Sequence, residues 1–463
     1  MFNVSDVQGN ILRGYRKPRV RHLILEIADA GEARGWCAAI VSGRDDVPQV
    51  TSQAPWEAKP VSCFNIGITF EGLRTLGVPD QSLATFPTEF VDGMSARAIK
   101  LGDVGESAPE TWPAPFDKPK AVHLIASIYA DEVAELDRIE RQALQGKAFK
   151  RLGTREGFKF NGDYVHFDYR DNISQPRFAG VHDPDNYPDA QPMAPLGTVL
   201  LGYPNNFEGL LWRVPTPGVL GLNGTFNAFR VLEQDVAAFE TYLTEAAKYL
   251  LSHSQGDELL PRDAEATIGP RLSREGALRE IVAAQMCGRW RNGVPLALSP
   301  DTPEHREPPN KFDYDAAPRC PYGAHIRRAN PRGGQIVQRV ANHSRRLIRR
   351  GMPYGPPYDP ANPDSAKQER GLLGNFIGAS LGAQFEAMCC DWVNVGLQDP
   401  RITGSNDPLI GANEPATSWF DLLLKSGATI RLRGLPRFVR SRGGAYTFLP
   451  SISAIRYLGS LGK

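Results

Sequence analysis

The side chains best suited to chemistry lie in three short segments of the sequence. His325 is followed closely by Arg327 and Arg332, and an imidazole among guanidinium groups suits a bound polyanion whose carboxylates need cationic partners. Arg349 lies farther along the same basic stretch, and Asp171 opens the run Asp-Asn-Ile-Ser-Gln-Pro. Taken singly, the three segments also fit ordinary structural roles: a core histidine, a solvated strand edge and an Asx-rich turn.

Several common enzyme classes are excluded by their missing motifs. The eight histidines form no His-Glu-x-x-His pair, and the chain contains no Walker loop and no Gly-x-Gly-x-x-Gly after a strand. Residues 378–382 match Gly-x-Ser-x-Gly, but that hydrolase triad needs a later histidine and none follows His343. The six cysteines form no Cys-x-x-Cys, which predicts reduced thiols, a cytoplasmic location and no covalently attached c-type haem.

The overall composition predicts a globular protein without a nucleic-acid or membrane partner. The chain has 463 residues and a net charge of +1, so no whole-molecule field attracts a polyanion. The first residues lack the basic and apolar regions of a secretory signal. A bilayer-spanning helix needs about 18 or more consecutive apolar residues, and the sequence has no such run.

Strands that alternate with single helices must position these segments. The apolar patterns predict strands over residues 21–28, 61–70, 121–129, 224–232 and 371–379, with helices over 30–41, 131–144, 235–251 and 383–393. This alternation fits a parallel α/β sheet and equally fits two ferredoxin-like halves with antiparallel sheets. Residues 197–217, which are rich in Gly, Pro and Asn, favour a boundary between domains 1–215 and 216–463.

Six segments, in order along the chain, together resemble the dye-decolorizing peroxidase family. The opening Asp-Val-Gln-Gly-Asn-Ile-Leu-Arg-Gly-Tyr is similar to the start of that family, and Asp-Asn-Ile-Ser-Gln-Pro at 171 to its distal motif Asp-Gly-Ile-Ser-Gln-Pro. The remaining four segments are similar to its proximal, distal-arginine and C-terminal pieces; they are residues 324–332, 349–355, 384–386 and 442–454.

This resemblance implies a fold, a cofactor and a reaction. The fold is α+β, with two ferredoxin-like halves of the dimeric α+β barrel type around one non-covalent haem b; residues 1–215 carry the distal aspartate loop, and residues 216–463 carry the haem ligand and the distal arginine. The reaction reduces hydrogen peroxide and oxidises bulky organic donors such as dyes by one-electron steps. The alternatives are a haem-binding carrier or sensor of the same fold with weakened activity, and a haem-free homologue.

On the proximal side, the resemblance implies that His325 binds the iron. Arg327 and Arg332 are the expected partners of the haem carboxylates. An acid on the second ring nitrogen of His325 would increase its electron donation to the metal, and Glu386 is our candidate for that acid, with Asp391 as the neighbouring choice.

On the distal side, the resemblance implies that Asp171 is the acid–base and that Arg349 stabilises developing charge. Arg350 should point to the opposite face of a strand. The family motif usually carries glycines where this chain has Asp168 and Asn172. We expect Asn172 to adopt a left-handed backbone conformation, and Asp168 either couples to Asp171 or points away from it.

The implied partners are hydrogen peroxide and an organic electron donor, and a homo-oligomer is compatible with the sequence. The last residues, 458–463, loosely resemble peptides that load such peroxidases into encapsulin shells. No flexible linker precedes them, so we expect the end of a final helix and no encapsulin loading.

Overall fold

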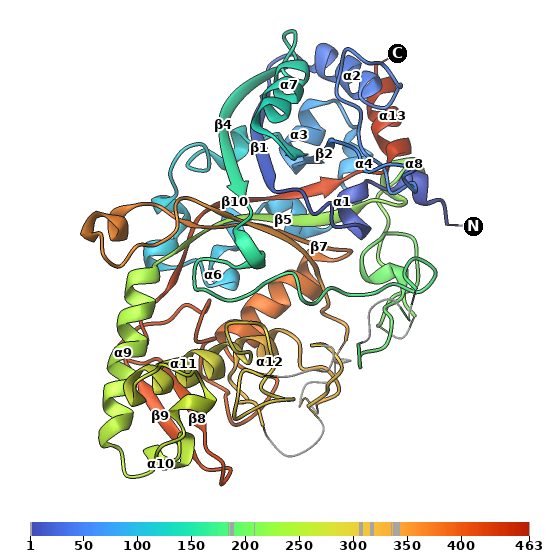
Figure 1. The fold of residues 1–463 in the computed structure, drawn as a ribbon. Helices are drawn as coiled ribbons and strands as arrows, with labels where there is room; N and C mark the ends of the chain where they lie inside the picture. Colours follow the sequence, from blue (N-terminus) through green and yellow to red (C-terminus); the bar gives the residue numbers. More distant parts are fainter. Residues whose placement is uncertain are drawn as a thin grey trace.

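The core of the molecule is one eight-stranded sheet in the order β4-β1-β3-β2-β10-β5-β7-β6 (Figure 1). The computed structural model describes residues 2–183, 185, 189–207, 209–304, 309–314, 319–334, 336 and 343–462. All pairs of neighbouring strands in this sheet are antiparallel, which excludes the parallel alternative.

The first half of the sheet has the strand order of a ferredoxin-like unit, β4-β1-β3-β2, with one helix after its first strand and one after its third. Its elements are β1 (Arg19–Ile27), α2 (Ala30–Ala39), β2 (Ser62–Ile68), β3 (Leu124–Ala130), α7 (Val133–Ala143) and β4 (Phe149–Phe158). The amphipathic helix α7 buries Leu136, Ile139 and Ala143, which recur at helical spacing and pack on the sheet.

The second half repeats this order as β10-β5-β7-β6. Its elements are β5 (Thr225–Gln234), α9 (Val236–Ser252), β6 (Ile348–Tyr354), β7 (Gly371–Gly378), two π-helical segments (Leu381–Glu386 and Met388–Asn394) and β10 (Val439–Leu449). Two antiparallel ferredoxin-like halves are therefore confirmed.

The halves meet edge to edge through β2 and β10, where Ile68 pairs with Phe448. Their core is continuous, because Phe226 and Phe448 of the second half pack against Phe86 and Phe90 of the first. The division into domains 1–215 and 216–463 stays a prediction.

A helical lobe lies below the second half of the sheet and has its own apolar core (Figure 1). It contains α9, α10 (Gly256–Leu259), α11 (Arg274–Cys287), α12 (His325–Ala329), and the hairpin of β8 (Trp419–Leu423) and β9 (Thr429–Arg433). The remaining α-helices are α1 (Gly9–Leu12), α3 (Phe70–Thr75), α4 (Asp80–Leu83), α5 (Thr88–Asp92), α6 (Ala98–Leu101), α8 (Gly218–Gly221) and α13 (Ile452–Ser460). The last of these confirms the expected final helix.

The outer strands β4 and β6 approach each other at Gly157. A Cβ atom at this position would lie 3.0 Å from the carbonyl oxygen of Pro353 and 3.1 Å from Cβ of Met352. Only a glycine lets the two backbones come this close without displacement. The sheet is thus curved enough to bring its two ends together.

Candidate active site

The short helix α12 begins at His325 and is held in place by Arg328. The buried guanidinium of Arg328 donates from Nε to the carbonyl of Gly323 (3.0 Å) and from Nη1 to those of Trp392 (3.1 Å) and Ser405 (2.9 Å). A five-residue helix has little stability of its own, so these long-range bonds fix its position.

The His325 ring is oriented by a buried carboxylate. Its Nδ1 lies 2.9 Å from Oδ2 of Asp407, whose side chain is fully buried. Oδ1 of Asp407 accepts from the backbone N–H groups of Leu409 (2.9 Å) and Ile410 (3.0 Å). An ionised carboxylate only accepts hydrogen bonds, so Nδ1 of His325 carries the proton and Nε2 presents a lone pair.

Asp407 is kept in its charged form despite its burial. Burial raises the pKa of Asp407, but His325, Arg328 and the N–H of Ile410 lower it, and the net pKa lies below the ordinary value. The carboxylate therefore remains a strong acceptor for the imidazole N–H.

The predicted role of Glu386 as the partner of His325 is wrong. The buried carboxylate of Glu386 accepts two bonds from Arg97 (2.9 and 2.8 Å) and one from the hydroxyl of Tyr446 (3.0 Å). Asp391, the neighbouring choice, accepts from Arg345 (2.7 Å). Proximity in sequence does not identify the partner, because the acid that contacts His325 comes from a loop 82 residues later.

The distal loop is attached to strand β6 at Arg349. Gln175 donates through Nε2 to the Arg349 carbonyl (2.8 Å) and accepts through Oε1 from its N–H (3.2 Å). Nη2 of Arg349 donates to the carbonyl of Ser174 (3.2 Å). The structure thus joins the segments of Asp171 and Arg349, and both side chains are exposed.

Asn172 and Asp168 both have a left-handed backbone, each with φ of 60°. The expectation for Asn172 is confirmed, and both positions are ones where glycine carries no steric penalty. Asn172 donates to Oδ1 of Asp163 (3.3 Å), while the N–H of Asp171 donates to the Asp163 carbonyl (2.8 Å). Short local bonds therefore shape the loop.

Asp168 points into a different environment from that of the distal groups. Burial raises its pKa, Arg291 lowers it and Glu240 raises it again, with a net increase. Its charged neighbours thus belong to α9 and the loop after α11, which favours the interpretation that Asp168 points away from Asp171.

Arg350 lies on the opposite face of β6, as predicted. Its half-buried guanidinium donates to the carbonyls of Asn10 (2.9 Å) and Ile11 (3.1 Å). Burial lowers the pKa of Arg350 to about 10. The side chain holds the N-terminal segment against the sheet.

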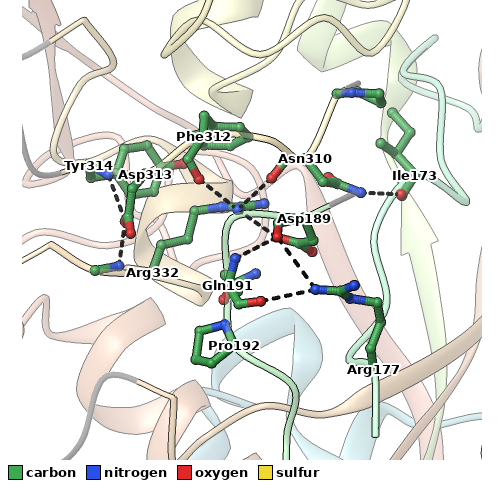
Figure 2. Close-up of polar contacts among 12 residues, drawn as sticks. Ile173, Arg177, Asp189, Gln191, Pro192, Asn310, Phe312, Asp313, Tyr314 and Arg332 are labelled. Carbon is green, nitrogen blue, oxygen red and sulfur yellow. Dashed lines mark hydrogen bonds and ion pairs between the residues drawn. The ribbon is translucent and has the colours of Figure 1, made fainter. Parts of the chain in front are cut away.

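The two proximal arginines already have protein partners. Arg327 donates to the carbonyl of Cys320 (2.6 Å) and lies over the rings of Tyr322 (4.1 Å) and Tyr314 (4.8 Å). Arg332 is buried and donates to Asp189 Oδ1 (3.2 Å) and to the carbonyls of two residues that precede it in the chain, Asn310 (3.1 Å) and Phe312 (2.9 Å) (Figure 2). Contact of either guanidinium with a haem carboxylate stays a prediction.

Comparisons with known proteins agree with this geometry. Residues 6–157 match the family model described as the DyP dimeric alpha+beta barrel domain. The chain is 30% identical over 497 residues to dye-decolorizing peroxidase msp1 of Mycetinis scorodonius, covering 98% of this chain and 87% of that protein. It is 29% identical to the multifunctional dye peroxidase DyP2 of Amycolatopsis sp., covering 98% and 96%.

The chain belongs to the dye-decolorizing peroxidase family.

Solved structures extend the likeness to the whole fold. A fungal DyP-type peroxidase from Auricularia auricula-judae superposes with a TM-score of 0.80 at 26% identity, covering 99% of this chain and 100% of the other. A dye-decolorizing peroxidase solved with 2,6-dimethoxyphenol gives a TM-score of 0.80 at 27% identity, with the same coverage.

As a dye-decolorizing peroxidase, the protein reduces hydrogen peroxide and oxidises bulky organic donors by one-electron steps. Enzymes of this family are haem enzymes. No helix in the described part of the chain is long and apolar enough to cross a membrane.

The described residues of this dye-decolorizing peroxidase fit such a cofactor. No hydrogen bond to Nε2 of His325 is formed by any described residue, so its lone pair is available to a metal. Arg346, which the sequence analysis did not single out, has buried Nε and Nη2 donors without a partner among the described residues. Its Nη1 donates to the Pro192 carbonyl (2.7 Å), and burial lowers its pKa to about 10. An anionic group beside Arg346 would accept hydrogen bonds from Nε and Nη2.

Proposed function

We propose that His325 binds the iron of a non-covalent haem b through Nε2, and that Asp171 and Arg349 act on hydrogen peroxide at the opposite face. The observation that carries the proposal is the 2.9 Å bond from Nδ1 of His325 to the buried Asp407. This bond fixes the tautomer that a metal needs, and it makes the imidazole a stronger donor.

When bound, haem would supply the iron at which the O–O bond breaks and would store two oxidising equivalents. Asp171 accepts the proton from the inner oxygen of hydrogen peroxide and returns it to the outer oxygen, which leaves as water. Arg349 stabilises the negative charge that develops on the departing oxygen, because its guanidinium is already tied to the distal loop.

The overall reaction balances with two donors. Each donor loses one electron and one proton. Hydrogen peroxide takes up the two electrons and the two protons and becomes two molecules of water. We propose arginines 327, 332 and 346 as the partners of the haem carboxylates, and bulky organic molecules such as dyes as the donors. The six cysteines are all free, which supports a reducing cytoplasm as the compartment.

The test is haem binding by His325→Ala. The variant should lose most of its haem, or hold it weakly with a shifted Soret band. His166→Ala and His343→Ala are matched controls, because both are buried or half-buried histidines outside α12. A wild-type spectrum in His325→Ala, with haem loss in either control, would show that the ligand is another histidine.

A further inference from the structure

A large cavity lies beside the distal loop but is separate from the proposed catalytic groups. Its volume is about 610 Å³, and its walls come from the loop after β4, from α9 and α11, and from the loop after β6. Small-molecule sites typically have about 300–1,000 Å³. His325, Asp171 and Arg349 are not among the lining residues. The cavity can therefore hold a molecule other than peroxide.

The cavity carries an excess of negative charge. Four carboxylates line it, from Asp168, Glu240, Glu245 and Glu280, against the guanidinium groups of Arg279 and Arg291.

The two arginines are already paired within this group. Arg291 lies 3.0 Å from Glu240 and 3.2 Å from Glu280, and Arg279 also pairs with Glu240. The carboxylate of Asp168 forms no ion pair with any described residue. Burial raises the pKa of Asp168 and of Glu280, and Asp168 is the carboxylate of this group that lacks a cationic partner among the described residues.

His166 contributes a neutral imidazole ring to the lining. The ring is 7% exposed, and its Nε2 lies 2.8 Å from the carbonyl oxygen of Tyr354 in β6. A carbonyl only accepts, so Nε2 carries the proton and the buried Nδ1 has a lone pair with no described partner. Burial lowers the pKa of His166 to about 4, which keeps the ring neutral near pH 7.

The remaining walls suit a flat, positively charged ring system. Phe160, Tyr164 and Tyr358 supply aromatic surfaces, and Pro357 and Pro360 supply rigid apolar ones. Aromatic faces attract cations as well as other rings, so they reinforce the preference set by the carboxylates.

We propose that this cavity binds a cationic aromatic electron donor, such as a protonated or permanently charged arylamine. The inference rests on the proposed function only in calling the ligand an electron donor. Asp168 lies three residues before Asp171, and His166 bonds the strand that carries Arg349, so a ligand here touches both segments of the distal side.

The experiment is a titration of the haem-loaded enzyme, without peroxide, with thionin, a cationic three-ring dye with two primary amino groups. Binding should be saturable with one site. In Asp168→Asn with Glu280→Gln, each lost charge should weaken binding about threefold, for a total of about tenfold. Asn tolerates the left-handed backbone at 168. Glu275→Gln, on the same helix but outside the lining, is the matched control and should bind like the wild type.

Two further comparisons sharpen the result. An anionic anthraquinone sulfonate should not compete with thionin. If the double variant fails to fold, Tyr358→Leu tests the aromatic wall and should weaken thionin binding several-fold.

The proposal is overturned if the double variant or Tyr358→Leu binds thionin like the wild type, or if the anionic dye competes equally. Asp171→Asn separates this proposal from the proposed function, since it should lose the peroxide reaction and still bind thionin.

Discussion

The proximal and distal sides of this peroxidase are built in opposite ways. His325 is fixed through a chain of buried partners, from Asp407 to the backbone of Leu409 and Ile410. Asp171 and Arg349 are exposed, and the bonds that join their segments pass mainly through the backbone and Gln175. The side that holds a metal needs a constant geometry, whereas the side that exchanges protons needs access for peroxide and water.

The largest effect should come from removing the distal charge. Arg349→Leu should slow the reaction with hydrogen peroxide by about 10²–10³, the usual loss when a preorganised charge is removed. Haem content should stay unchanged, and stopped-flow absorbance after mixing with peroxide measures the rate.

Arg350→Leu is the control for that variant. It should leave the rate nearly unchanged but lower the melting temperature, because Arg350 is half-buried and donates hydrogen bonds to the carbonyls of Asn10 and Ile11. A greater loss of rate in Arg350→Leu than in Arg349→Leu would contradict the assignment of the two faces of β6.

On the proximal side, Asp407→Leu should weaken the binding of haem. The loss of the acceptor for Nδ1 should weaken haem affinity about 10–100-fold. Haem transfer to an acceptor protein measures this affinity. Asp407→Glu should restore part of it, and Asp391→Asn, which does not touch His325, should change little. Wild-type haem retention in Asp407→Leu would show that the Asp407 bond has no influence on the ligand.

Stability should fall as the pH drops below about 6.5, and His166 should account for part of this loss of stability. Its folded pKa, lowered by burial to about 4, lies below that of an unfolded histidine, about 6.5. Between these values the unfolded chain binds a proton that the folded chain excludes. The free energy of unfolding therefore falls by about 1.4 kcal/mol for each unit by which the pH drops. Denaturant unfolding at pH 7, 6 and 5 measures the free energy of unfolding, which should fall less steeply in His166→Phe than in the wild type. Identical slopes in the two proteins would mean that His166 titrates normally.

The smallest effect should come from Asn172→Gly. Glycine accepts the left-handed backbone more cheaply, so stability should stay the same or rise by up to about 1 kcal/mol. Thermal unfolding measures the change. A clear destabilisation would show that the bond from Asn172 to Asp163 outweighs the backbone preference.

Local patterns predict most of the central strands but neither the outer strand β4 nor the central strand β10. The apolar runs at β1, β2, β3, β5 and β7 were identified, because these strands are buried on the sheet. The strand β4 was missed, since it is an outer strand with a charged sequence and mostly accessible side chains. The predicted helix over 383–393 proved π-helical, a difference that periodicity does not resolve.

For the site, the motifs predicted side chains but not their partners. Asp407 could not be found by spacing, because it lies in an irregular loop whose position depends on Arg328 and the Asp407–Val393 backbone bond. Arg346 is one of several arginines in its segment, and what distinguishes it is that its buried Nε and Nη2 have no partner among the described residues. Pairing across long loops is set by tertiary packing, which leaves no periodic signal.

The approach of β4 to β6 at Gly157 bears on how the protein avoids aggregation. Outer strands carry unpaired backbone groups on which strands of another molecule can add. Here the ends of both outer strands shield each other, and Pro353 offers no N–H for such pairing. A bulky residue at position 157 would push these strands apart, and the expected defect is self-association of folded chains through the exposed strand ends.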